Sequence, residues 1–229
     1  EGVFRRHVYN DGIAKVKLDR LRKHHLQAWR KRLEKAPALI SRSKLSEPRL
    51  KERSAATVNR DMVPLRAALR RVLSPGAPNT SAAWQEALRP IKGADRRREV
   101  YLDRSERRKL LAALSEDIEP FVRGLCLLPL RPGALAAVKV GDFEIRTRTL
   151  TIGTDKNGVP RQIGVPESIA DFLAEQSNGR SPGDPMFMRA DGSPWSKDKW
   201  KGPIKGAVTA SKLNPASSAY TLGHSAMTD

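Results

Sequence analysis

Three short phrases carry side chains that could grip a phosphate. Arg131 stands in the phrase Leu-Arg-Pro-Gly at 130–133, directly after an apolar run, and Lys156 stands in Asp-Lys-Asn-Gly at 155–158. Tyr220 opens the third phrase, Tyr-Thr-Leu-Gly-His-Ser at 220–225. An arginine can hold a phosphate through two parallel hydrogen bonds, and a lysine adds a compact positive charge. An arginine, a lysine and a helix-borne polar pair in this order suit a phosphate-binding site.

The charge of the whole chain supports an anionic partner. The 229 residues include 43 Lys and Arg against 25 Asp and Glu, a formal charge of +18. We expect this surplus to be spread over both halves of the chain, where it favours nucleic acid through counterion release. An anionic membrane is a weaker candidate because no long apolar stretch exists. A solvated basic surface without a specific partner stays open.

The low cysteine and histidine content limits which covalent links and metal sites the chain can form. The single cysteine, Cys126, lies in an apolar run and is expected in the core, which excludes a disulfide framework and a cysteine-based zinc site. The four histidines show no metal-ligand spacing, so we expect no histidine-based metal site. No signal peptide is visible, and we expect the protein to work in the reducing environment of the cytoplasm.

The first ninety residues are predicted to be helical. Apolar residues at 18, 21, 29 and 33 suggest one helix, and a stripe at 58, 62, 65, 69 and 72 predicts another that begins near Ser54. Arginines on and beside the outer face of this second helix are candidate DNA contacts: Arg60, Arg66, Arg70 and Arg71. For any single one of them, a solvated surface is the simpler interpretation. The polar stretch 37–48 is predicted to be a loop.

A basic segment separates this part from the next. Residues 89–99 are polar, lack periodicity and read as a linker, in which Arg96, Arg97 and Arg98 could follow a DNA backbone. Asp103 with Glu106 has the form of a capping box at a helix start. A more apolar helix is expected from 119 to 128. The predicted domains are a helical bundle at 1–88, the linker, and a mixed domain at 100–229.

A β-hairpin follows in the second domain. Short β-favouring runs at 149–152 and 161–165 flank Asn157-Gly158, which is a strong turn signal. Lys156 would then project from a ribbon that can reach a groove, although a solvated lysine is also expected there. Further helices are predicted from 167 to about 176, from 196 to about 213, and from 217 onward. The fold class is mainly α with a small β-sheet.

The ordered phrases resemble the tyrosine recombinases, the phage-type integrases. The resemblance rests on Leu-Arg-Pro-Gly, the hairpin with its lysine, a Trp- and Lys-rich helix, and the 220–225 phrase, in that order. It implies a SAM-like, DNA-binding core-binding domain at 1–88 and a catalytic domain at 100–229 that is incomplete at its C-terminus. It also implies double-stranded DNA recombination sites as the partner, a tetramer on paired sites for the full-length protein, no membrane, and a location at the bacterial nucleoid.

The chemistry that this resemblance implies is phosphoryl transfer without metal or nucleotide. A tyrosine attacks the scissile phosphate and forms a 3′-phosphotyrosyl link, while arginines stabilise the transition state and a lysine protonates the leaving oxygen. Carried over by position, Arg131 is the first arginine and Lys156 the hairpin lysine. Tyr220 occupies a position usually held by histidine.

Departures from the family pattern limit this expectation. Gly223 stands where the second arginine is expected, and Ala134 replaces a frequent acidic residue. The chain stops at Asp229, and Tyr9 and Tyr101 match no nucleophile position. We therefore expect a fragment that binds DNA without cleaving it.

Two other functions stay open. One is a non-enzymatic DNA-binding or regulatory protein on a recombinase scaffold, which Gly223 favours. The other is a metal-dependent nuclease, for which Asp142, Glu144 and Asp155 are the nearest carboxylates, although they form no convincing Mg²⁺ motif.

Overall fold

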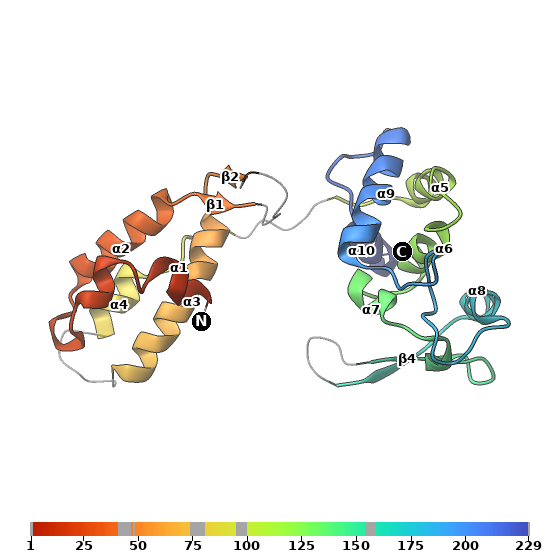
Figure 1. Cartoon of the computed structure of the whole chain (residues 1–229), viewed down its shortest axis with the longest axis horizontal. Helices are drawn as coiled ribbons and strands as arrows, with labels where there is room; N and C mark the ends of the chain where they lie inside the picture. Colours follow the sequence, from red (N-terminus) through yellow and green to blue (C-terminus); the bar gives the residue numbers. More distant parts are fainter. Residues whose placement is uncertain are drawn as a thin grey trace. The chain divides into compact units, whose positions relative to one another are not determined.

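The computed structural model describes residues 2–40, 47, 49–73, 81–94, 100–153 and 159–228. The chain divides into two compact units, Glu1–Arg98 and Glu99–Asp229, each with its own hydrophobic core (Figure 1). Most elements are helices, and the described strands form two small antiparallel sheets. The prediction of a mainly α fold with a small β-sheet is confirmed. Among the described helices, none has both the length and the apolar character that crossing a membrane requires.

The first unit is a bundle of short and long helices. Its elements, in chain order, are α1 (Gly2–His7), the 3-10 turns η1 (Gly12–Lys15) and η2 (Leu18–Arg20), α2 (Lys23–Lys35), β1 (Ala38–Leu39), β2 (Leu50–Lys51), α3 (Ala55–Val72) and α4 (Ser81–Ala87). Helices α2 and α3 both pack against α4 and against each other. Trp29 of α2 and Met62 of α3 are completely or almost completely buried in the shared core.

Helix α3 forms where the apolar stripe predicted it. The Ser54 hydroxyl accepts a hydrogen bond from the Thr57 amide and caps the helix. The stripe is buried as far as Leu69, but Val72 is 59% exposed. The backbone turns away from the helix at Leu73, which packs against the core in place of Val72. The burial predicted for Val72 is therefore wrong because the helix ends there.

Two other expectations for this unit need correction. Leu18 lies in a separate 3-10 turn and is 44% exposed, because the extended backbone at Leu21 breaks the helical phase before α2 begins. The segment predicted as a loop contains part of a short ladder, in which Leu39 pairs with Leu50. A two-residue strand is too short to show a period of two in sequence.

The second unit combines helices with a three-stranded sheet. Its elements are α5 (Arg104–Ala112), α6 (Glu119–Leu127), α7 (Pro132–Ala136), the 3-10 turn η3 (Val140–Asp142), β3 (Phe143–Glu144), β4 (Thr149–Ile152), β5 (Arg161–Gly164), α8 (Glu167–Ser177), α9 (Lys197–Ala210) and α10 (Ala219–Thr228). Strand β4 is central and pairs with β3 and β5. Figure 1 shows this sheet at one end of the unit and helices α5 and α9 at the other.

Helix α6 is the centre of the second core. Its Phe121 is fully buried and stacks on Trp195 and Trp200, with ring centroids 5.9 and 5.3 Å apart. Helix α10 packs against α6, and also contacts α7 and α9. Because α10 carries the phrase at 220–225 and α7 follows the arginine of the phrase at 130–133, this packing sets the distance between two of the phrases predicted to bind phosphate.

Local signals predicted several of these elements correctly. The capping box at α5 is present, with the Glu106 amide donating to Asp103 (2.8 Å) and the Asp103 amide donating to Glu106 (3.0 Å). The two runs of the hairpin pair as β4 and β5, with Ile152 opposite Arg161. Strand β3 was not predicted. The Asn157-Gly158 turn lies outside the described residues.

Candidate nucleic-acid interface

Arg131 stands at the junction between α6 and α7. Helix α6 ends at Leu127, and Arg131 is the N-cap residue of α7, with extended backbone (φ −68°, ψ 145°). Its carbonyl accepts hydrogen bonds from the amides of Ala134 (2.9 Å) and Leu135 (3.0 Å). The neighbours Leu130 and Pro132 are buried, whereas the Arg131 residue is exposed. The backbone therefore holds the arginine at the surface from both sides.

Tyr220 lies in the first turn of α10. The flanking residues Ala219 and Thr221 are buried, and Tyr220 itself is 44% exposed. The Ser218 amide donates to the Thr221 hydroxyl (3.1 Å), and the Thr221 amide donates to the Ser218 carbonyl (2.8 Å), which fixes the start of the helix. Tyr220 is thus displayed on a helix end whose backbone is held in place.

Gly223 is the point at which α10 contacts the backbone segment that precedes α7. A Cβ atom built on Gly223 would lie 2.9 Å from the carbonyl oxygen of Leu130. The backbone of α10 therefore touches the residue directly before Arg131, one helical turn after Tyr220. The structure brings the segments of Arg131, Tyr220 and Gly223 together. Sequence reasoning assigned Gly223 only a missing side chain and gave no signal of this close backbone contact.

Several predicted site residues lie outside the described residues. They are Lys156, Arg96, Arg97 and Arg98, and also Asp155 of the nuclease alternative. Strands β4 and β5 flank the segment that contains Lys156, and its role stays a prediction. The described start of the expected linker is bound to the first unit, because the Asn59 side chain pairs with both the amide (2.8 Å) and the carbonyl (3.0 Å) of Ile91.

The arginines of α3 divide into two groups. Arg60, Arg70 and Arg71 are all exposed; Arg60 and Arg71 lie opposite the buried stripe of the helix, and Arg70 lies beside it. Arg66 is only partly exposed, and its Nε is buried without a hydrogen-bond partner among the described atoms. Of the four α3 arginines predicted to contact DNA, three are therefore accessible to a polyanion, and Arg66 is partly buried.

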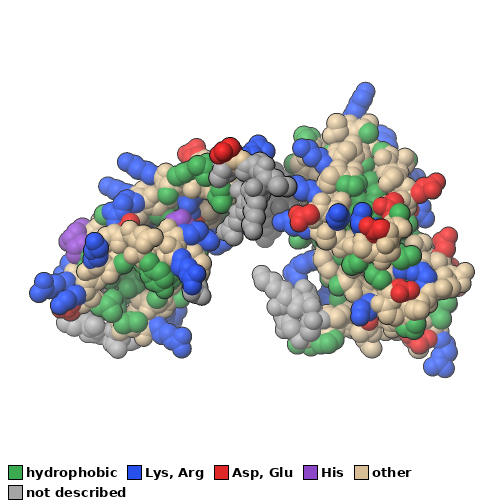
Figure 2. Space-filling view, in the orientation of Figure 1, with side chains coloured by type: hydrophobic (Ala, Val, Ile, Leu, Met, Phe, Trp, Pro, Cys, Tyr) green, Lys and Arg blue, Asp and Glu red, His purple; other side chains and the backbone are tan. Residues whose placement is uncertain are grey.

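The positive charge is concentrated in the first unit. Residues 1–98 contain 25 Lys and Arg against nine Asp and Glu, a net charge of +16, whereas residues 99–229 contain 18 against 16, a net charge of +2. On the face drawn in Figure 2, basic side chains dominate the first unit and acidic ones are interspersed over the second. The expectation of charge spread over both halves is wrong. Overall composition could not show this division, but a count on each side of the linker would have.

Some cations of both units are already neutralised by carboxylates. In the first unit, the Lys23 ammonium lies 2.7 Å from Glu86, and Arg53 is paired with Asp61 in a buried position. In the second unit, Arg123 is paired with Glu119 at 2.8 Å. A cation that has a carboxylate partner releases fewer counterions on meeting DNA. The exposed arginines of α3 therefore matter more than the total charge suggests.

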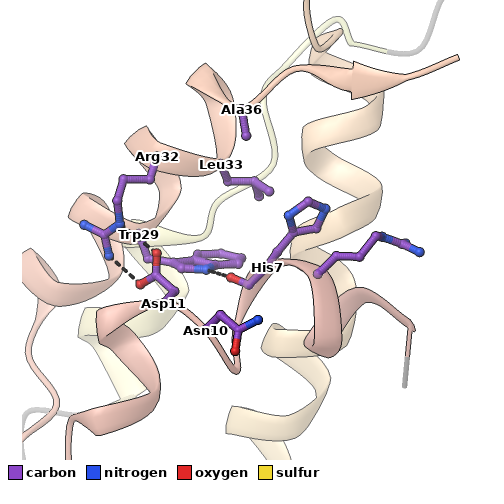
Figure 3. Close-up of a pocket in the computed structure, with 8 residues that line it drawn as sticks. His7, Asn10, Asp11, Trp29, Arg32, Leu33 and Ala36 are labelled. Atoms are coloured by element: carbon purple, nitrogen blue, oxygen red, sulfur yellow. Dashed lines mark hydrogen bonds and ion pairs between the residues drawn. The ribbon is translucent and has the colours of Figure 1, made fainter. Parts of the chain in front are cut away.

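A pocket of about 190 Å³ in the first unit is lined by residues that bind one another (Figure 3). The Trp29 ring nitrogen donates to the His7 carbonyl (2.5 Å), and the Arg32 guanidinium donates to both oxygens of the Asp11 carboxylate (2.7 and 2.6 Å). These hydrogen bonds to Arg32 hold the pKa of Asp11 below its usual value. Because the Arg32 guanidinium is already bound to Asp11, it is not a ready partner for a phosphate in this pocket.

The nuclease alternative finds no support in the described geometry. No group of three or more His, Cys, Asp or Glu side chains in the described part of the chain could hold a metal ion. Asp142 accepts a hydrogen bond from the Lys139 amide (2.8 Å), and Glu144 accepts one from the Arg146 amide (3.2 Å). Both carboxylates therefore stabilise local backbone turns.

Comparison with known proteins identifies the fold. No protein-family model matches the chain, and no curated protein matches it significantly in sequence. Among solved structures, the Tn1549 transposon integrase in complex with transposon right end DNA is similar with a TM-score of 0.71 and 14% identity, over 99% of this chain and 78% of that one.

Two other structures agree. A lambda integrase dimer bound to a COC′ core site is similar with a TM-score of 0.63 and 17% identity, over 98% of this chain and 60% of that one. The XerH site-specific recombinase bound to a palindromic difH substrate gives a TM-score of 0.59 and 15% identity, over 94% and 63%. The chain has the fold of these integrases and recombinases, as the ordered phrases predicted.

Proposed function

We propose that this chain binds duplex DNA at a recombination site, as part of a site-specific recombinase of the integrase type. The observation that carries the proposal is the similarity of fold to the Tn1549 integrase over 99% of the chain, together with the net charge of +18. The Tn1549, lambda and XerH proteins were all solved on DNA. A polyanion is also the partner that the composition of this chain favours.

The first unit supplies most of the electrostatic attraction. Its net charge of +16 and the exposed Arg60, Arg70 and Arg71 on one helix provide sequence-independent contacts to phosphates. The second unit is close to neutral, so in this proposal it contributes to DNA affinity through a few side chains that contact the phosphate and not through long-range attraction. In this proposal Arg131 and Tyr220 bind one backbone phosphate, and Lys156 reaches the same phosphate from the hairpin.

In this proposal the site holds the phosphate in position and stabilises the negative charge on its oxygens. The Arg131 guanidinium can hold two non-bridging oxygens, and the Tyr220 hydroxyl can donate to a third. In a site-specific recombinase of this type, a tyrosine nucleophile would form a 3′-phosphotyrosyl link at this phosphate and release the 5′-hydroxyl of the next nucleotide, without metal or nucleotide cofactor. Tetramer assembly on paired sites belongs to the same proposal.

Salt titration of DNA binding tests the proposal. If six or more phosphates are contacted, the affinity for a duplex of about 30 base pairs falls by roughly three orders of magnitude or more between 50 and 200 mM salt. Fluorescence anisotropy with a labelled duplex measures this directly. Binding that does not respond to salt would refute the proposal.

A second candidate is a DNA-binding or regulatory protein that does not cleave. Gly223 favours it, because no guanidinium is present at the second arginine position, and loss of one such donor lowers the rate by about 10²- to 10³-fold. A nicked suicide duplex that carries the cognate site tests this second candidate. A covalent protein–DNA adduct would refute it, whereas stable binding without an adduct agrees with both candidates.

A further inference from the structure

We infer that Gly223 is a positioning residue: its missing side chain lets α10 dock directly on the Leu130 carbonyl, and this contact holds Tyr220 beside Arg131. The inference rests on the proposed function for the identity of the ligand, a backbone phosphate of DNA. Gly223 then has a structural role of its own and is more than a catalytic position that has lost its arginine. The packing itself is a property of the folded chain and can be tested without DNA.

The contact leaves no room for any side chain. A Cβ on Gly223 would lie 2.9 Å from the Leu130 oxygen, a separation shorter than real Cβ contacts show. The atom that it meets belongs to the backbone and cannot rotate away as the end of a flexible side chain would. An alanine at this position therefore requires either α10 or the Leu130 segment to move.

The Leu130 segment is held on both sides. The Leu130 amide donates to the Leu128 carbonyl (2.7 Å), and the Leu130 side chain is buried. On the other side, the Arg131 carbonyl accepts the first two hydrogen bonds of α7. A displacement of the Leu130 carbonyl would therefore disturb the backbone that presents Arg131.

Helix α10 is equally constrained. Ala219 is 5% exposed and Leu222 is completely buried, and both belong to the second core. The helix packs against α6, α7 and α9. If a side chain at 223 pushes α10 outward, the buried contacts of Leu222 are lost and Tyr220 moves with the helix. The docking contact thus couples the position of Tyr220 to that of Arg131.

Glycines of the second unit differ in how closely they are packed: a Cβ on Gly141 would lie 3.0 Å from the Pro182 carbonyl oxygen, whereas two others have open space. A Cβ on Gly206 in α9, or on Gly133 in α7, would meet no atom within 4 Å. Gly206 lies inside a helix, as Gly223 does. An alanine at Gly206 fills open space and gains helix propensity, so Gly206→Ala is a matched control for the substitution at Gly223.

The consequence concerns the second arginine of the recombinase pattern. An arginine at 223 would have to displace α10 before its guanidinium could reach a phosphate. A single change from glycine to arginine therefore does not rebuild the site in this chain. In this inference Arg131 and Tyr220 bind the phosphate, and the backbone contact at Gly223 fixes the position of the helix that carries Tyr220 against the segment that carries Arg131.

Thermal unfolding tests the docking contact alone. We expect Gly223→Ala to lower the Tm of the second unit by several degrees, and Gly206→Ala to leave it unchanged or raise it. Equal Tm values for the two variants would overturn the inference. This comparison needs no DNA, so it stands even if the chain fails to bind a duplex, in which case only the proposed function fails.

DNA binding tests the positioning role. We expect Gly223→Ala to weaken binding in the wild-type background and to have a much smaller effect when Arg131→Gln is already present, because both changes remove the same phosphate contact. We expect Gly223→Arg to bind no more tightly than wild type. Additive effects of Gly223→Ala and Arg131→Gln, or tighter binding by Gly223→Arg with a salt slope steeper by about 0.9, would overturn the inference.

Discussion

Neutralising the exposed arginines of α3 gives the sharpest test of where DNA affinity resides. The triple variant Arg60→Gln, Arg70→Gln, Arg71→Gln removes three cations from the first unit. All three residues are exposed, and glutamine is a good helix former, so we expect the fold to survive with little loss of stability. The variant thus changes the electrostatic surface without changing the core.

The magnitude follows from counterion release. Each phosphate contact contributes about 0.9 to the slope of log K against log salt, so three contacts contribute about 2.7. If wild type and variant bind equally at 1 M salt, the variant therefore binds roughly 500-fold more weakly than wild type at 0.1 M salt. The remaining cations of the first unit keep the variant in a measurable range.

The control removes the same formal charge from cations that have carboxylate partners. Lys23, Arg123 and Arg189 each form an ion pair, with Glu86, Glu119 and Asp191 respectively. We expect the triple glutamine variant of these residues to change the slope by less than about 1. Both variants are titrated by fluorescence anisotropy on the same duplex. Equal slope changes would refute the idea that the exposed arginines of α3 are the main phosphate contacts.

Three further predictions concern stability and reactivity. Burial raises the pKa of the Cys126 thiol to about 11, so its reaction with a disulfide reagent at pH 8 should be about two orders of magnitude slower in the folded chain than after unfolding; equal rates would contradict this. Burial, and next the Arg53 guanidinium, lower the pKa of His7, so the unfolded chain binds more protons below pH 6.5 and stability should fall as the pH drops from 7 toward 5. The urea midpoints of wild type and His7→Gln at these two pH values measure this, and the variant should lose that part of the pH dependence. Asn59→Ala leaves the backbone amide and carbonyl of Ile91 without the side-chain partner, which should lower the free energy of unfolding by about 1–3 kcal/mol and speed tryptic cleavage after Lys92; an unchanged cleavage rate would argue against the tether.

The elements that sequence predicted best depend on local interactions. The stripe of α3 and the capping box of α5 each involve residues within a few positions of one another, so their physics is visible in a short window. The pairing of β4 with β5 also follows from neighbouring runs. The prediction for Val72 failed because helix ends depend on where the chain must turn, and a periodic pattern does not mark that point.

The features that sequence missed depend on contacts between distant residues. Gly223 and Leu130 are far apart in the chain, and their close approach exists only because α10 packs on the second core. The pairing of Asn59 with Ile91 and the partial burial of Arg66 have the same origin. The two-residue ladder of β1 and β2 is stabilised by its surroundings, and its own sequence carries no pattern that would reveal it.

A structure of the chain bound to a DNA duplex is the most direct test of the proposed interface. We expect one backbone phosphate to lie within hydrogen-bond distance of both the Arg131 guanidinium and the Tyr220 hydroxyl, with other phosphates at Arg60, Arg70 and Arg71. A duplex that binds elsewhere, with Arg131 and Tyr220 both away from the DNA, would contradict the assignment of this site.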